Sequence, residues 1–133
     1  MDTLTVDLVT PETLFFSGAA TLVEAPGTLG DFGVLPGHMN FISTLRPGVI
    51  TIHDDKEQIL RLFVAGGIAE VNNVSCTILA ERVIDLSKIT RVEAEARLAA
   101  AKAALDDSFD EDAKTDANRE LELAEAIVLA LAA

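Results

Sequence analysis

The sequence predicts a mainly β fold with an α-helical end: an N-terminal antiparallel β-sandwich followed by a C-terminal antiparallel two-helix hairpin. Residues 1–86 hold all eight glycines and all four prolines of the 133-residue chain, whereas residues 87–133 hold neither and contain 14 alanines. Apolar residues alternate with period two in the first part and recur at spacings of three and four in the second. We therefore expect a β-sandwich domain at 1–86 and a helical hairpin at 87–133.

The strands of the first domain are predicted by short alternating segments between turn residues. Leu4, Val6 and Leu8 alternate with their neighbours, as in a strand with one buried face. By the same pattern we expect strands at 4–9, 19–25, 48–53, 59–65, 68–71 and 74–79. Strands at this spacing favour a sandwich or barrel. The chain has no strand–helix–strand unit of roughly 30 residues, which excludes a Rossmann-type sheet.

The second domain begins at Thr90-Arg91-Val92-Glu93, a sequence that fits a capping box at a helix start. We expect this helix to end near Leu105, because the acidic stretch 106–112 is poor in helix formers. A second helix shows one apolar stripe, formed by Ala117, Leu121, Ala124, Val128 and Leu131. Such a hairpin has little core of its own and needs a neighbour for stability.

The charge balance excludes several classes of partner. The chain has 22 acidic and 10 basic residues, a net charge of −12. This argues against nucleic-acid binding, which needs a basic face, and against docking on anionic lipid. The longest apolar run, Ala126–Ala133, is far shorter than the roughly 20 residues of a membrane helix, so we expect no direct membrane span. The chain opens without a signal-peptide pattern, and its single cysteine favours a reducing, cytoplasmic compartment.

The residues that usually carry catalysis do not form a convincing set. His38, His53 and Cys76 are the only histidines and cysteine, and they lack metal-ligand spacing, so we expect no metal and no cofactor. Cys76 shares its parity with Val74 and Ile78, which predicts a buried structural thiol. Gly66-Gly67 is not followed by Gly-Lys-Ser/Thr and predicts a strand break with close backbone approach. We therefore expect a protein that is not an enzyme.

The most informative segment is 27–38, which holds four glycines and one proline among apolar residues. Glycine permits a positive φ and proline restricts φ, so this composition predicts a loop of defined shape. Phe32, Val34 and Leu35 must either pack inward or meet a partner. The residues alone leave both interpretations open: a compact turn that covers the end of the sandwich, and an interface.

The order of several motifs carries a resemblance to a known family. The stretch from Gly30 to His38, Gly-Asp-Phe-Gly-Val-Leu-Pro-Gly-His, resembles the signature loop of the epsilon subunit of F-type ATP synthases. Further motifs fall in the family's order and spacing: Phe16-Ser17-Gly18, Arg46-Pro47-Gly48, Gly66-Gly67-Ile68-Ala69-Glu70-Val71 and Leu79-Ala80-Glu81. Each motif is weak alone, but their ordered combination over the whole chain is specific.

The resemblance implies a rotor subunit of the central stalk, which couples proton-driven rotation of the membrane c-ring to ATP synthesis in the catalytic head. One face of the sandwich would bind the gamma subunit, and one end would rest on the c-ring. The residues that match the c-ring end are Gly30, Asp31, Phe32, Gly33 and His38, with Asp31 expected to make a polar contact or to cap its own turn. The location implied is the cytoplasmic face of the bacterial inner membrane, as a peripheral part of the complex.

The helical half departs from the family pattern. In many relatives the hairpin reaches the alpha and beta subunits and inhibits ATP hydrolysis through basic residues. Here no Lys or Arg follows Arg119, whereas Glu120, Glu122 and Glu125 are acidic, so we expect weak inhibition or none. The family's nucleotide motif is degenerate at Thr90 and Glu93, which predicts no nucleotide site. The alternative hypothesis is a sandwich that binds a small ligand and carries an oligomerising helical tail.

Overall fold

The computed structural model describes residues 3–37, 40–54, 56 and 59–132, and these divide into two compact units. The first unit is Met1–Asp85 and contains every strand; the second is Leu86–Ala133 and contains both helices. The division falls after Asp85, one residue before the boundary that composition indicates.

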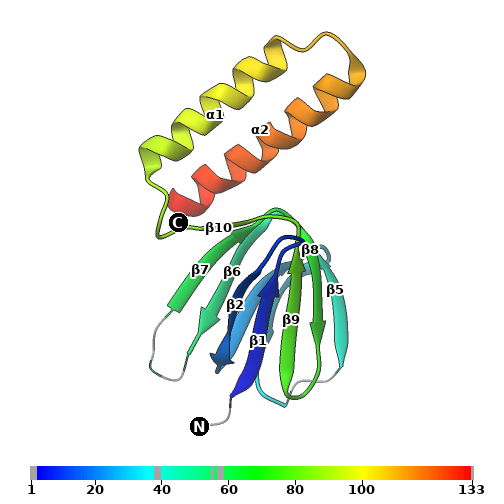
Figure 1. Cartoon of the computed structure of the whole chain (residues 1–133), viewed down its shortest axis with the longest axis vertical. Helices are drawn as coiled ribbons and strands as arrows, with labels where there is room; N and C mark the ends of the chain where they lie inside the picture. The colour runs from blue at the N-terminus through cyan, green and yellow to red at the C-terminus, as the bar shows by residue number, and fades with distance from the viewer. Residues whose placement is uncertain (1–2, 38–39, 55, 57–58, 133) are drawn as a thin grey trace. The chain divides into compact units, whose positions relative to one another are not determined.

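The β unit contains ten strands, coloured in chain order in Figure 1. Their bounds are β1 (Leu4–Val9), β2 (Leu14–Ala20), β3 (Leu22–Gly27), β4 (Gly30–Val34), β5 (Phe41–Leu45), β6 (Gly48–His53), β7 (Ile59–Val64), β8 (Gly67–Val71), β9 (Ser75–Ala80) and β10 (Val83–Asp85). The strand order is β10-β7-β6-β3-β5-β8-β9-β1-β2, with β4 paired to β3 off this path. Among the described strands β1 and β9 run parallel, and the other pairs are antiparallel.

The sheet folds into a sandwich because β3 and β5 are joined by a single pair, Gly27 with Leu45. One layer contains β10, β7, β6, β3 and β4, and the other contains β5, β8, β9, β1 and β2. Alternate residues of both layers meet in one hydrophobic core, which includes Leu8, Ile50 and Ile78, each with no exposed surface. The predicted fold class is thereby confirmed.

One predicted strand, 19–25, is wrong as a single element. The chain leaves β2 at Ala20 and enters β3 at Leu22, and the two strands pair with different neighbours. Ala20 and Val23 are both fully buried although they lie three positions apart, so the inward parity shifts at this junction. Thr21 holds the junction through its amide, which donates to the carbonyl of His53 over 2.8 Å.

The segment 27–38 is not a plain loop, because residues 30–34 form β4. This strand pairs along the whole of its length with β3 through a turn at Thr28 and Leu29. Its glycine content concealed the strand: a Cβ on Gly27 would lie 2.5 Å from the carbonyl oxygen of Gly30, so the hairpin needs glycine there. Strands β5 and β10 were likewise not predicted, since they are short and lack clear alternation.

The helical unit consists of α1 (Arg91–Asp106) and α2 (Glu111–Ala132), as Figure 1 shows. Thr90 is the N-cap of α1: its hydroxyl accepts from the amide of Glu93 over 3.1 Å and donates to the Glu93 carboxylate over 3.0 Å. The predicted start and end of α1 are confirmed. Asp110 caps α2, because its Oδ1 accepts from the amide of Ala113 over 2.7 Å.

The buried face of α2 is rotated from the predicted stripe. Ala117 and Ala124 are buried as expected, but Leu121, Val128 and Leu131 are only half-buried. The other buried positions are Leu123, Ile127 and Ala130. A helix turns 100° per residue, and Ala117 lies at the edge of the buried face. A stripe built from Ala117 at spacings of four and three therefore runs beside that face and not along its centre.

Candidate functional site

The segment singled out by the sequence forms the β3–β4 hairpin, whose tip is anchored to the β5–β6 corner. The amide of Thr28 donates to the carbonyl of Thr44 over 3.0 Å, and the two threonine hydroxyls lie 2.7 Å apart. The amide of Arg46 donates to the carbonyl of Pro26 over 2.9 Å. These bonds tie the tip to the end of β5 and the start of the β5–β6 connection and give it a fixed position.

Asp31 lies in this tip and is paired with Arg46. The guanidinium Nη2 of Arg46 lies 2.5 Å from Oδ1 of Asp31, and its Nη1 donates to the carbonyl of Gly27 over 2.6 Å. Both side chains are exposed, Asp31 by 75% and Arg46 by 46%. Asp31 is therefore a charge-compensated carboxylate that is held toward solvent. In the sequence Arg46 stands out only as part of Arg46-Pro47-Gly48, and no local pattern links it to Asp31.

Apolar side chains surround the ion pair. The rings of Phe32 and Phe41 meet edge to face with centroids 5.0 Å apart, which fixes the middle of β4 against β5. Leu29 is fully exposed at the tip and Ile42 is 73% exposed. These residues line a shallow hollow of about 430 Å³ together with Asp31. The tip thus combines exposed apolar surface with one oriented polar group, as protein interfaces do.

Four of the five predicted c-ring residues lie together on one strand. Gly30, Asp31, Phe32 and Gly33 all belong to β4. His38 lies outside the described residues, but Gly37 donates from its amide to the carbonyl of Asn73 over 2.8 Å, in the turn between β8 and β9. That turn adjoins the start of β5, whereas Arg46 follows the end of β5.

Gly66 and Gly67 behave as predicted, as a strand break with close backbone approach. Gly66 has φ +113° and Gly67 has φ +152°, and a Cβ on Gly67 would lie 2.2 Å from the carbonyl oxygen of Leu79. They line a hollow of about 610 Å³ whose other residues are mostly apolar. Thr10 and Glu81 are the polar side chains on its wall, so it lacks the converging polar groups of a small-ligand site.

Cys76 is a buried structural thiol, as its parity predicted. Its side chain is 1% exposed within the core, and burial raises the pKa of the thiol to about 11. Val74, which was expected on the same face, is 63% exposed because it belongs to the turn before β9. Within the described part of the chain, no three His, Cys, Asp or Glu side chains are grouped so that they could hold a metal ion.

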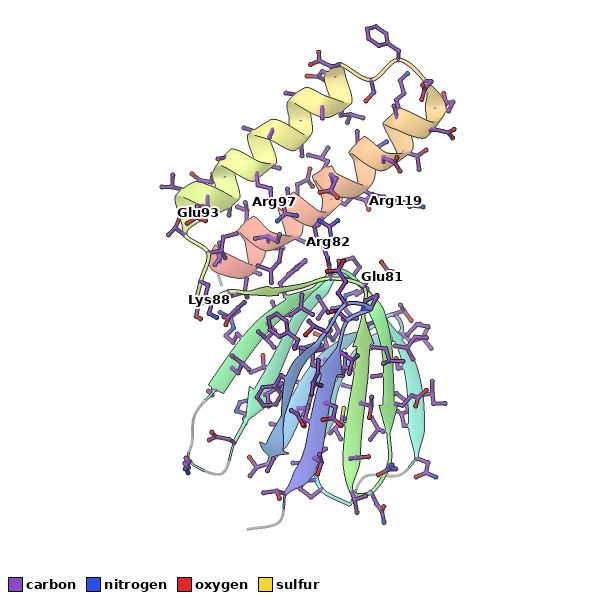
Figure 2. The ribbon with its side chains drawn as sticks, in the orientation of Figure 1. Glu81, Arg82, Lys88, Glu93, Arg97 and Arg119 are labelled. Atoms are coloured by element: carbon purple, nitrogen blue, oxygen red, sulfur yellow. The ribbon has the colours of Figure 1, made fainter. Side chains whose placement is uncertain are left out.

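In the helical unit, Arg97 faces the other helix and Arg119 faces solvent, as Figure 2 shows. Arg97 of α1 points toward α2, where its Nη2 lies 3.8 Å from Oε2 of Glu120. Arg119 lies on α2 and is exposed. At the start of α1 the Thr90 hydroxyl donates to the carboxylate of Glu93. Among the described helices, none is both long and apolar enough to cross a membrane.

Comparison with known sequences gives one consistent result. Residues 3–85 match the family model described as "ATP synthase, Delta/Epsilon chain, beta-sandwich domain". The chain is 46% identical over 126 residues to the ATP synthase epsilon chain of Paramagnetospirillum magneticum, with 95% of both chains covered. It is 41% identical over 129 residues to the epsilon chain of Rhodospirillum rubrum, with 97% of this chain and 96% of that one covered.

Comparison with solved structures supports the same fold. A chain in the Euglena gracilis mitochondrial ATP synthase structure of OSCP, F1 and c-ring superposes with a TM-score of 0.82 at 22% identity, covering 97% of this chain and 81% of that one. A chain in the central stalk and c-ring structure of the Tetrahymena thermophila enzyme gives a TM-score of 0.68 at 17% identity, covering 98% and 97%. At these identities the likeness concerns the fold.

Proposed function

Because this chain belongs to the ATP synthase delta/epsilon family, among its epsilon chains, we propose that it is a non-catalytic rotor part that couples c-ring rotation to ATP synthesis in the catalytic head. Its partners would be the gamma subunit and the c-ring, within a peripheral complex at the cytoplasmic face of the bacterial inner membrane. The observation that carries the proposal is the anchored β3–β4 hairpin. A close-packed sandwich that holds an exposed tip in a fixed position transmits force with little deformation.

The c-ring contact is proposed at Gly30, Asp31, Phe32 and Gly33, with His38 as a further member of the site. Asp31 would supply the polar contact through the carboxylate oxygen that Arg46 leaves free, since Arg46 contacts Oδ1. Because Arg46 already compensates the charge of Asp31, the free oxygen can accept a hydrogen bond from a neutral donor on the ring as well as from a cation. Exposed Leu29 would add apolar contact beside it.

The test replaces Asp31 in the complete ATP synthase. Asp31→Arg would place a cation against Arg46 and remove the acceptor, so we expect weaker association of the catalytic sector with the membrane ring and lower proton-driven ATP synthesis. Asp31→Asn, which keeps an acceptor, should lose less. Because Asp31 is exposed, thermal unfolding of the isolated chain should change little. Asp116→Arg, an exposed acid on α2, is the matched control. Normal ring association of Asp31→Arg would remove Asp31 from the site.

The helical hairpin is proposed to be weakly inhibitory or non-inhibitory. Arg97 is engaged with Glu120 inside the hairpin, and the last turns of α2 carry no cation for an acidic surface on the alpha or beta subunits. ATP hydrolysis should therefore change little when residues 88–133 are deleted. Strong activation by the deletion would refute this.

We also propose that the chain lacks a functional nucleotide site. Glu93 places a carboxylate where the family motif would place a cation, and this negative charge would repel the phosphates of a nucleotide. Isothermal titration of the full chain with ATP should give no binding at micromolar nucleotide, and saturable binding in that range would contradict the proposal. Co-purification with gamma separates the rotor function from the alternative of a small-ligand sandwich.

A further inference from the structure

The motif Arg46-Pro47-Gly48 links β5 to β6 beside the β3–β4 hairpin, and the proposed function leaves it without a role. Pro47 restricts the residue before it to extended backbone conformations, so Arg46 has few alternatives. A Cβ on Gly48 would lie 2.8 Å from the Cβ of Pro26, so glycine at this position lets the base of the hairpin lie close to β6. The motif therefore brings Arg46 to the hairpin in a restricted conformation.

Arg46 makes three polar contacts with the hairpin, and they reach both of its strands. On β3, the Arg46 amide donates to the carbonyl of Pro26 over 2.9 Å, and Nη1 donates to the carbonyl of Gly27 over 2.6 Å. On β4, Nη2 lies 2.5 Å from Oδ1 of Asp31, whose cross-strand partner is Pro26. One residue outside the hairpin thus connects the end of β3 to the carboxylate on β4.

These contacts lie at the surface, so stabilising the fold is a poor explanation for them. Ion pairs between side chains as exposed as Arg46 and Asp31 contribute little to the free energy of unfolding. Their geometry is nevertheless specific, because a planar guanidinium with both Nη groups engaged fixes two acceptors relative to each other.

The tip of the hairpin has little packing that could fix it without Arg46. Leu29 is fully exposed. Gly30 has φ +138°, and apart from its chain neighbours no described atom would lie within 4 Å of a Cβ built on it. The Arg46 side chain therefore restrains a segment that core contacts leave free.

We propose that Arg46 is a positioning residue for the c-ring contact: it holds the Asp31 carboxylate and the hairpin tip in one orientation, and it acts on the ring through them. The inference rests on the proposed function. Holding the tip in its bound orientation raises affinity, because less conformational freedom is lost on association. Lysine would replace Arg46 only in part, since an ammonium is a point charge without the planar fork that holds two acceptors together.

The test is a double-mutant cycle between Arg46 and Asp31 in the catalytic sector, which carries the full chain. The quantity measured is its Kd for membranes stripped of that sector. Arg46→Ala should raise the Kd about tenfold and Arg46→Lys about threefold. In an Asp31→Ala background, Arg46→Ala should raise the Kd less than about threefold, because no carboxylate is left to orient. Arg91→Ala is the matched control, since exposed Arg91 pairs with Glu95 on α1 over 3.0 Å, and its Kd should equal that of the parent.

A second readout follows the tip itself in the isolated full chain. Thermal unfolding of Arg46→Ala should stay within about 2 °C of the parent. The backbone order parameters of Leu29 and Gly30, measured by NMR relaxation, should fall from about 0.85 toward 0.6. Arg46→Lys should restore part of this order. Order parameters that are unchanged in Arg46→Ala would overturn the positioning role.

The outcomes of the cycle separate this inference from the proposed contact. If Asp31→Ala leaves the Kd unchanged, the contact at Asp31 is wrong, and the positioning role is wrong with it. If Asp31→Ala raises the Kd and Arg46→Ala does not, only the positioning role is wrong. If the two losses are fully additive, Arg46 acts independently of Asp31, which also overturns the positioning role.

Discussion

The β-sandwich unit and the helical hairpin bury different kinds of side chain. The sandwich core is built mainly of Leu, Ile and Val, with Cys76 and four alanines, contributed by strands far apart in the sequence, and many of these residues have no exposed surface. The buried residues of α1 are Ala94 and Ala101, and α2 buries three alanines together with Leu123 and Ile127, so small side chains form a larger share of the buried set in the hairpin. Because buried apolar area sets most of the stabilising free energy, the sandwich can hold its own shape, whereas the hairpin gains little from its helix contact. A stiff unit suits force transmission, and a weakly held one suits rearrangement.

The largest effect is expected when the chain is divided between Asp85 and Leu86, which tests whether each unit folds alone. We expect residues 1–85 to unfold cooperatively, because the strands and core lie within this fragment. We expect residues 86–133 alone to lose most of their helix, since helices of 16 and 22 residues with alanine faces are marginal without tertiary packing. Far-UV circular dichroism measures both. A fragment 86–133 that is fully helical and melts cooperatively would overturn the comparison.

Truncating one apolar side chain in each unit measures the difference in their packing directly. Ile78→Ala removes a side chain with no exposed surface from the centre of β9, and we expect a loss of about 2–5 kcal/mol in the free energy of unfolding. The matched change in the hairpin is Leu98→Ala, at a half-buried position of α1, for which we expect about 1 kcal/mol or less. Urea unfolding of the full chain, followed by signals specific to each unit, measures both losses. Equal losses would show that the hairpin is packed as tightly as the sandwich.

The buried thiol gives a pH test confined to the sandwich. The pKa of Cys76 rises from 9.0 to about 11 through burial, so between these values the unfolded chain has released a proton that the folded chain retains. Stability is therefore complete below pH 9 and falls as the pH rises toward 11, on the order of 2–3 kcal/mol for a shift of this size.

Cys76→Ala is the control for the alkaline loss. The variant should be less stable at neutral pH, because it leaves a small cavity, but its stability should fall less between pH 9 and 11. Equilibrium unfolding at several pH values measures this. If the parent and the variant lose stability in parallel over this range, another group is responsible for the alkaline transition.

The same contrast explains what could be predicted from sequence. The ends of α1 were predicted closely, because capping at Thr90 and the acidic break are local signals that tertiary contacts do not override, whereas the buried face of α2 depends on its packing and was predicted only in part. The long alternating strands were predicted for the same reason. The junction at Thr21 was not, since a change of layer is a tertiary event that leaves period two intact on both sides. Strand β4 was hidden because glycine serves loops and close backbone approach alike.

The candidate site divides in the same way. Its location in the segment 30–33 came from a resemblance that short motifs could carry. The ion pair between Asp31 and Arg46 joins residues 15 positions apart, and no local pattern marks it.

The smallest expected effect concerns the start of α1, where the Thr90 side chain caps the helix. Thr90→Ala removes the acceptor for the Glu93 amide, and we expect a loss of about 1 kcal/mol of helix stability. Hydrogen exchange of the first-turn amides of α1 should accelerate about fivefold, while the β1 amides stay protected. Thr90→Ser keeps the hydroxyl and should restore the protection. If exchange in the sandwich also became faster, the two units would unfold as one cooperative molecule, and the contrast in their stabilities would be wrong.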